Sequence, residues 1–245
     1  MRSVFWLAVG ILLLSAQASE AAGGFSDWAV IVVAGDWHAE TGAPSEIFDN
    51  ARHDVSAALV GIGFSPQNIV QFSVRPERYP ADAPRASTAK QIAQGLWDLS
   101  NHAQGGCLAY FTSHGSPDGI LLGDKLLSPR QMAHIIDNAC GGKPTVVIVS
   151  ACFSGVFVPA LKAPERIVLT AARADRASFG CGEEDRYNYF DTCALQWLMK
   201  AGDFPDFGKD VIACIRAREK KEQATPPSRP QLYVGTKADI IPRWR

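Results

Sequence analysis

The sequence predicts an α/β fold in which a mostly parallel sheet lies between two layers of helices. Short, nearly continuous apolar runs such as WAVIVVAG and TVVIVSAC are typical of strands that are buried on both faces. Segments with helical periodicity alternate with these runs along the chain, as in βαβ units. The chain has 245 residues, which is enough for one domain with a single large core.

The first half of the chain is predicted to alternate strands and helices. The apolar run at 28–35 ends in glycine, and the segment within 43–64 places apolar residues at helical spacing before two further glycines. The run NIVQFSV at 68–74 is a second strand, and a polar, proline-rich loop at 75–87 follows it. The next segment, STAKQIAQGLWDLSNHA, is a helix whose first serine or threonine is a suitable N-cap.

The second half continues this alternation. CLAYFTSHG at 107–115 is a third strand, and DGILLGDKLLS forms a hairpin around its Gly-Asp pair. SPRQMAHIIDNACGG is a helix with proline in its first turn and glycine at its end. Strands at 145–152 and 166–172 follow, then helices at 189–202 and 206–223, and LYVG near the end is an edge strand.

The N-terminal residues 1–22 have the pattern of a signal peptide. Arg2 precedes the apolar stretch VFWLAVGILLL, and small residues suited to cleavage follow at Ala18 and Ala21. The stretch is short for a membrane span, so we expect export to the periplasm or the medium and no stable anchor; an uncleaved anchor is the alternative. The net charge of −1 gives no sign of a nucleic-acid partner.

Two reactive side chains stand at the ends of predicted strands. His114 and Cys152 each end an apolar run, and ligand crevices of parallel sheets lie outside the carboxyl ends of the strands. A thiolate attacks a carbonyl, and a nearby imidazole moves the proton. The N–H groups of Gly115 and Cys152 can hold an oxyanion. One such residue alone is more often structural, but two on neighbouring strands indicate a catalytic pair.

The same residues resemble a known family. YFTSHGSPDGIL and VIVSACFSG are similar to the His-Gly and Ala-Cys motifs of the legumains, or asparaginyl endopeptidases, which belong to the caspase–haemoglobinase class of cysteine peptidases. The resemblance runs from about Trp28 to about Trp197 and is to a short, bacterial-type member. It implies a caspase-like α/β/α sandwich, here one peptidase domain at 25–245, a peptide or protein substrate and no cofactor.

The resemblance implies roles in catalysis for four residues. Cys152 is the expected nucleophile and His114 the expected general acid and base. Asn50, from the segment NARHD that matches the legumain Asn-x-Arg-His segment, is expected to orient the imidazole. Gly115 contributes to the oxyanion hole. Asn50 as a simple helix cap is the alternative.

The resemblance also implies a pocket for the side chain before the cut bond. Its expected residues are Arg52, His53, Ser150, Ser178 and Asp191. An Arg facing an Asp suits a carboxamide, which can accept from one and donate to the other. Arg52 and Asp191 as a structural ion pair is the alternative. Ser150 replaces the acidic residue of typical legumains, which weakens the expectation of strict asparagine preference.

The sequence contains six cysteines, which in an exported protein tend to form disulfides. No CxxC or Cys/His cluster has metal-ligand spacing, so we expect no metal site. If Cys152 is free, at least one of the other five is also free or pairs with another molecule. Cys181 and Cys193 flank the expected pocket loop, and a disulfide between them is our hypothesis.

The sequence therefore predicts an exported cysteine endopeptidase that forms a thioester and cuts after Asn, with Asp as the second choice. An amine that resolves the same thioester would make the protein a transpeptidase or ligase. A catalytically silent caspase-like binding module is the third alternative, and the intact His, Cys, Asn and Gly positions oppose it.

Overall fold

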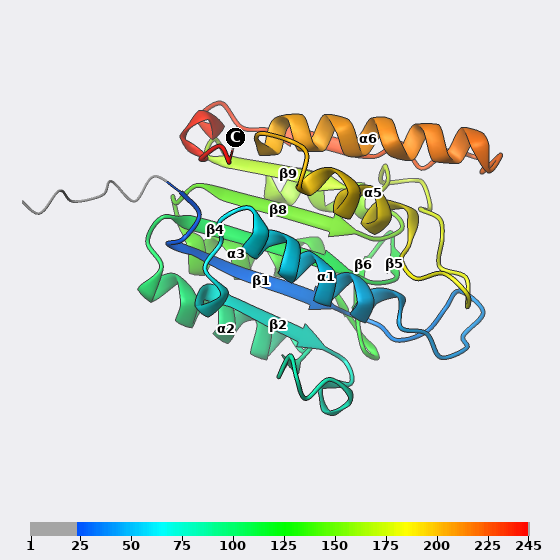
Figure 1. Cartoon of the computed structure of the whole chain (residues 1–245), viewed down its shortest axis with the longest axis horizontal. Coiled ribbons are helices and arrows are strands. Elements are labelled where there is room, and N and C mark those ends of the chain that lie inside the picture. Colours follow the sequence, from blue (N-terminus) through cyan, green and yellow to red (C-terminus); the bar gives the residue numbers. More distant parts are fainter. Residues whose placement is uncertain (1–23, 245) are drawn as a thin grey trace, which may run out of the picture.

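The computed structural model describes residues 24–244, so the predicted signal peptide at 1–22 lies outside the described residues. A seven-stranded sheet in the order β10-β9-β8-β4-β1-β2-β3 forms the centre, and helices cover both of its faces (Figure 1). The strands are β1 (Trp28–Ala34), β2 (Ile69–Ser73), β3 (Arg85–Ala86), β4 (Gly106–Thr112), β8 (Thr145–Ser150), β9 (Arg166–Thr170) and β10 (Gln231–Val234). All neighbouring pairs are parallel except β9 with β10. The predicted three-layer α/β fold with a mostly parallel sheet is confirmed.

The helices divide into two layers, one on each face of the sheet. They are α1 (Ile47–Gly61), α2 (Ala89–His102), α3 (Pro129–Cys140), α4 (Val158–Leu161), α5 (Tyr189–Leu198) and α6 (Phe204–Lys221). Val30 and Val32 of β1 belong to the core under α1, α5 and α6, whereas Ala29 and Ile31 belong to the core under α2 and α3. Successive strand residues point to opposite faces, which explains why this strand is apolar throughout.

Side-chain caps fix where several helices begin. Thr88 accepts from the backbone N–H of Gln91 at the start of α2, and Ser128 forms a capping box with Gln131 at the start of α3. Asn188 caps α5 and accepts from the N–H of Asp191 at 2.7 Å. The cap of α5 bears on the candidate site described below.

A small antiparallel sheet stands beyond the end of β4. It consists of β5 (Gly115–Ser116), β6 (Gly119–Leu122) and β7 (Lys125–Leu127). The β6–β7 turn is at the predicted Gly-Asp pair, where Gly123 has a φ of 65°. Figure 1 shows β5 and β6 near the carboxyl end of β4. Two short elements, β3 in the predicted loop at 75–87 and the four-residue α4, were not predicted because neither is long enough to show periodicity.

Four of the six cysteines form disulfides. Cys107 of β4 is bonded to Cys140 at the end of α3, and Cys193 of α5 is bonded to Cys214 of α6. Cys152 and Cys181 are free. The hypothesis of a Cys181–Cys193 bond is therefore wrong, because Cys193 faces α6 whereas Cys181 belongs to a separate small core with Ala34, Ile47 and Phe48.

Within residues 24–244, no helix combines the length and the apolar character that a membrane span requires.

Candidate active site

The strand ends bring His114 and Cys152 to the same edge of the sheet. β4 and β8 are neighbouring parallel strands, and Thr112 pairs with Ser150 in their register. His114 and Cys152 each follow two residues later, on strands that lie about 4.8 Å apart. A Cβ atom on Gly115 would lie 2.3 Å from the carbonyl oxygen of Cys152, so only glycine allows the two chains to approach this closely.

The imidazole of His114 is oriented by a backbone carbonyl. Its Nε2 lies 3.0 Å from the carbonyl oxygen of His38, in the loop after β1. Because a carbonyl only accepts, Nε2 carries the hydrogen and Nδ1 keeps the lone pair of the neutral ring. The ring of Phe48 in α1 packs against the imidazole edge-to-face, with an angle of 82° between the ring planes and centroids 5.1 Å apart. The ring is therefore held with its basic nitrogen free for a reaction partner.

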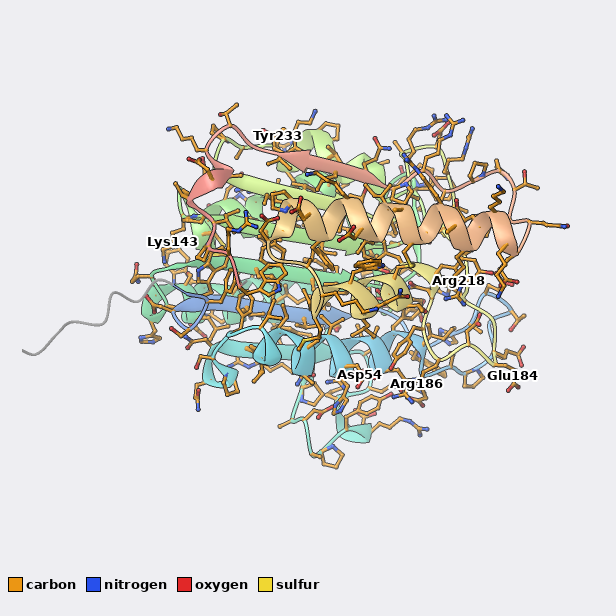
Figure 2. The ribbon with its side chains drawn as sticks, turned by 45° about the horizontal axis from the view of Figure 1, so that its top comes forward. Asp54, Lys143, Glu184, Arg186, Arg218 and Tyr233 are labelled. Carbon is orange, nitrogen blue, oxygen red and sulfur yellow. A yellow bond between two sulfur atoms is a disulfide. The ribbon has the colours of Figure 1, made fainter. Side chains whose placement is uncertain are left out.

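The structure gives Asn50 a different role from the predicted one. Its Nδ2 donates to the carbonyl oxygen of Arg186 at 3.2 Å, in the loop before α5, and not to His114. Nor does Asn50 cap α1, because Glu46 occupies the N-cap position. Arg186 also pairs with Asp54 at 3.2 Å, and Figure 2 shows these two residues on neighbouring elements. Asn50 thus helps to attach the loop between β9 and α5, at 171–188, to α1.

Ser178 contacts the sulfur of Cys152 through three of its atoms. Its backbone N–H donates to Sγ at 3.2 Å, and its Oγ and carbonyl oxygen lie 3.5 and 3.6 Å from Sγ. An N–H donor aimed at sulfur suits the thiolate that acts as the nucleophile. After Cys152 the chain turns sharply through Phe153, whose φ of 57° is in the left-handed region, and whose N–H donates to Arg176. The loop after β9 therefore reaches the candidate nucleophile.

Ser150 and Asp191 belong to one buried polar cluster. Tyr110 and Thr112 of β4 each donate a hydroxyl hydrogen to the Asp191 carboxylate at 2.6 Å. Asn188 donates to Asp191 at 2.7 Å and to the Oγ of Ser150 at 3.0 Å. Two of the predicted pocket residues are thus bridged by a carboxamide that belongs to the chain itself.

Arg52 and His53 lie in another network. Arg52 is fully buried, donates to Asp49 at 2.8 Å and to Asp82 at 3.0 Å, and also contacts Gln71. The exposed His53 contacts Asp82 at 2.9 Å. Asp191 has no cationic partner among residues 24–244, so neither the predicted Arg52–Asp191 pocket nor its structural alternative is observed. Asp49, one turn earlier on the same helix, gives Arg52 a nearer carboxylate.

Sequence reasoning missed four residues of the site: His38, Tyr110, Thr112 and Asn188. A signal existed for Tyr110 and Thr112, because polar side chains two residues apart in a buried strand must find partners on one face. None existed for His38, which contributes a carbonyl oxygen that every residue type carries.

The fold and the site together define a cysteine peptidase of the caspase-like type. The sequence model of the Peptidase C13 family, the legumain family, matches residues 86–212, and the chain belongs to this family. The crystal structure of caspase-1 from Spodoptera frugiperda is similar with a TM-score of 0.61 at 14% identity, over 86% of this chain and 88% of that chain, which shows a common fold. No curated protein matches the chain. The predicted family and enzyme class are confirmed.

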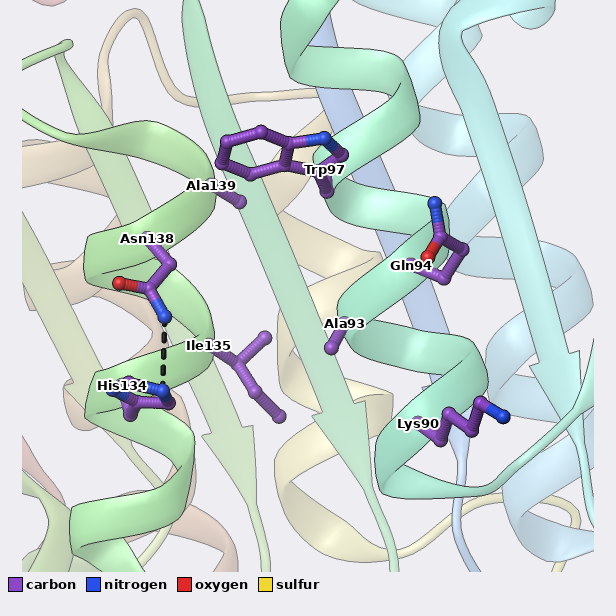
Figure 3. A pocket seen from close by; sticks show the side chains of 8 residues that line it. All are labelled: Lys90, Ala93, Gln94, Trp97, His134, Ile135, Asn138 and Ala139. Atoms are coloured by element: carbon purple, nitrogen blue, oxygen red, sulfur yellow. Dashed lines mark hydrogen bonds between the residues drawn. The ribbon is translucent and has the colours of Figure 1, made fainter.

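A groove elsewhere on the surface does not add to this site. Figure 3 shows a groove between α2 and α3, lined by Trp97, Ile135 and His134, whose ring accepts a hydrogen bond from Asn138. It lies on one helical layer and not at the strand ends. Among residues 24–244, no group of three or more His, Cys, Asp or Glu side chains is arranged to hold a metal ion.

The buried carboxyl of Asp191 has a pH-dependent effect on stability. Burial raises its pKa from 3.8 to about 6, against the opposing effect of hydrogen bonds from Thr112 and Tyr110. Because the folded pKa lies above the unfolded one, the favourable contribution is complete below pH 3.8 and is lost as the pH rises through about 6. A shift of this size corresponds to about 3 kcal/mol.

We therefore expect Asp191→Asn to raise the free energy of unfolding by about 1–3 kcal/mol at neutral pH and to change it little in acid. The amide oxygen can accept from Thr112 and Asn188, and the amide nitrogen can donate to the Tyr110 hydroxyl. Urea unfolding of both proteins at acidic and neutral pH measures the difference. An equal difference at both pH values would contradict the assigned ionisation.

Proposed function

We propose that the protein is an exported endopeptidase that hydrolyses peptide bonds after asparagine through a thioester on Cys152. The observation that carries this proposal is the placement of His114 and Cys152 at adjoining strand ends, with Nε2 of His114 bonded to the His38 carbonyl. The two disulfides favour an oxidising compartment, which supports export. Membership of the Peptidase C13 family supports a peptide or protein substrate.

In the proposed reaction, Nδ1 of His114 takes the proton from the Cys152 thiol, and Sγ attacks the peptide carbonyl. The negative oxygen of the tetrahedral intermediate accepts from the N–H groups of Cys152 and Gly115. Within residues 24–244, the N–H of Cys152 has no acceptor of its own. His114 then donates its proton to the leaving amine. Water, activated by the same ring, hydrolyses the thioester and regenerates the thiol.

Asparagine as the cleaved residue rests on the family resemblance and on the polar groups beside Cys152. Ser178 contacts the sulfur directly, and Ser150 and Asp191 lie beneath the ends of the strands. Asn188 already bonds to both Ser150 and Asp191, so a substrate carboxamide reaches them only if Asn188 moves. Without that movement, Ser178 is the predicted pocket residue that a substrate can contact.

A panel of fluorogenic peptides with Asn, Asp, Arg or Ala before the reporter tests this function. Wild type and Cys152→Ala are compared from acidic to neutral pH, with and without an added amine. We expect cysteine-dependent cleavage that is fastest after Asn. Cysteine-dependent cleavage that is fastest after another residue would keep the mechanism and overturn the specificity. Amide products in preference to acids would overturn hydrolysis in favour of ligation, and cleavage by Cys152→Ala would overturn the mechanism.

A further inference from the structure

The carboxylate of Asp36 organises the loop that leaves β1. Asp36 is only 6% exposed, and its Oδ1 accepts from the backbone N–H groups of Trp37 at 2.6 Å and of His38 at 3.1 Å. The same oxygen lies 2.7 Å from Nδ1 of the His38 ring. An aspartate that bonds to the backbone of the next two residues sets the direction of the chain at a turn.

The flanking chain is fixed independently of Asp36. The N–H of Gly35 donates to the carbonyl of Thr112 at 2.9 Å, and the Gly35 carbonyl accepts from Gly123 at 2.8 Å. On the other side, the carbonyl of Trp37 accepts from Ser45 at 2.9 Å. The carbonyls of Gly35 and Trp37 thus accept from other parts of the backbone. The carbonyl of His38 points toward the site, where it accepts from Nε2 of His114.

We propose that Asp36 is a positioning residue for His114 and acts through the carbonyl of His38. This inference rests on the proposed catalytic role of His114. By accepting from the N–H of His38, Asp36 holds the peptide units that present this carbonyl to Nε2. The bond to the carbonyl selects the tautomer in which Nδ1 is basic. Without it, the neutral ring can place its hydrogen on Nδ1 and lose the capacity to accept the proton of Cys152.

Asp98 of α2 gives the matched control. Its exposed carboxylate accepts from the side chain of Gln94 at 2.7 Å, so Asp98→Ala makes the same chemical change as Asp36→Ala on a helix and not at the strand ends. If the contacts of Asp36 with the backbone carry the effect, Asp98→Ala behaves like the wild type. Asp36→Asn is the conservative variant, because its amide oxygen can accept the same backbone hydrogens.

The experiment measures kcat, KM and the pH profile of Cys152 alkylation by iodoacetamide, with the labelled peptide identified by mass so that Cys181 is counted separately. We expect Asp36→Ala to lower kcat about tenfold to a hundredfold with little change in KM, and to move the alkylation profile toward that of an isolated thiol. Asp36→Asn and Asp98→Ala are expected to stay close to the wild type in both readouts.

A folded Asp36→Ala with wild-type kcat and alkylation profile would overturn the proposal, and so would an equal loss in Asp98→Ala. If Asp36→Ala does not fold, Asp36→Ser replaces it, because its shorter side chain cannot reproduce both backbone contacts. The alkylation profile needs no peptide substrate. It therefore tests the positioning of His114 even if the wild type cleaves none of the peptides and the proposed function fails.

Discussion

Replacing His114 with alanine is expected to lower kcat for peptide cleavage by about a hundredfold to ten-thousandfold, the range typical of general acid–base catalysis. In the proposed reaction, the ring takes the thiol proton and returns it to the leaving amine, so its loss should slow both the attack of Cys152 and the departure of the product. KM should change little, because no substrate contact is assigned to the ring. Initial rates with the best peptide of the panel give both constants.

His134→Ala is the matched control for this prediction. His134 lies on α3, where its ring accepts from Asn138 beside the groove between α2 and α3 (Figure 3). The same chemical change there should leave kcat within about twofold, because the groove is not at the strand ends. Surface substitutions of this kind also rarely change the free energy of unfolding by more than about 0.5 kcal/mol. Equal losses in the two variants would show that His114 does not have the assigned role.

The placement of His114 beside Cys152 could be predicted from sequence because the rule behind it is topological. Parallel strands end at one edge of a sheet, so His114 and Cys152 had to meet once their runs were recognised as neighbouring strands. The alternation of Val30 and Ile31 between two cores follows from strand geometry in the same way. These inferences need the order of elements and not the path of any loop.

Two partners of Asn50 and Arg52, namely Arg186 and Asp82, could not be predicted, because loops supply them. Arg186 and Asp82 are both far from α1 in the sequence, and only the folded path of their loops brings them to this helix. The family resemblance placed Arg52 and Asp191 in one pocket, and their complementary charges suited that role. The structure instead satisfies the guanidinium with Asp49 and Asp82, and the carboxylate with neutral donors.

The disulfide pairing depends on how helices pack. Counting cysteines showed that a second thiol must be free or bonded to another molecule, and Cys181 is that free thiol. The count could not tell which cysteine it was. Cys193 pairs with Cys214 because α5 packs against α6, a contact between two helices on one face of the sheet that local sequence does not specify.

Removing the Cys107–Cys140 disulfide is expected to cost about 3–4 kcal/mol of folding free energy. The bond closes a loop with a sequence separation of 33 residues, and the chain-entropy relation gives this magnitude for a loop of that length. Urea unfolding of Cys107→Ala/Cys140→Ala should show a lower midpoint and a larger m-value, because the unfolded chain becomes less compact. Cys181→Ala is the control that removes an unpaired buried thiol, and it should lower stability by much less. A double variant that unfolds at the wild-type urea concentration would mean that this bond does not restrict the unfolded chain.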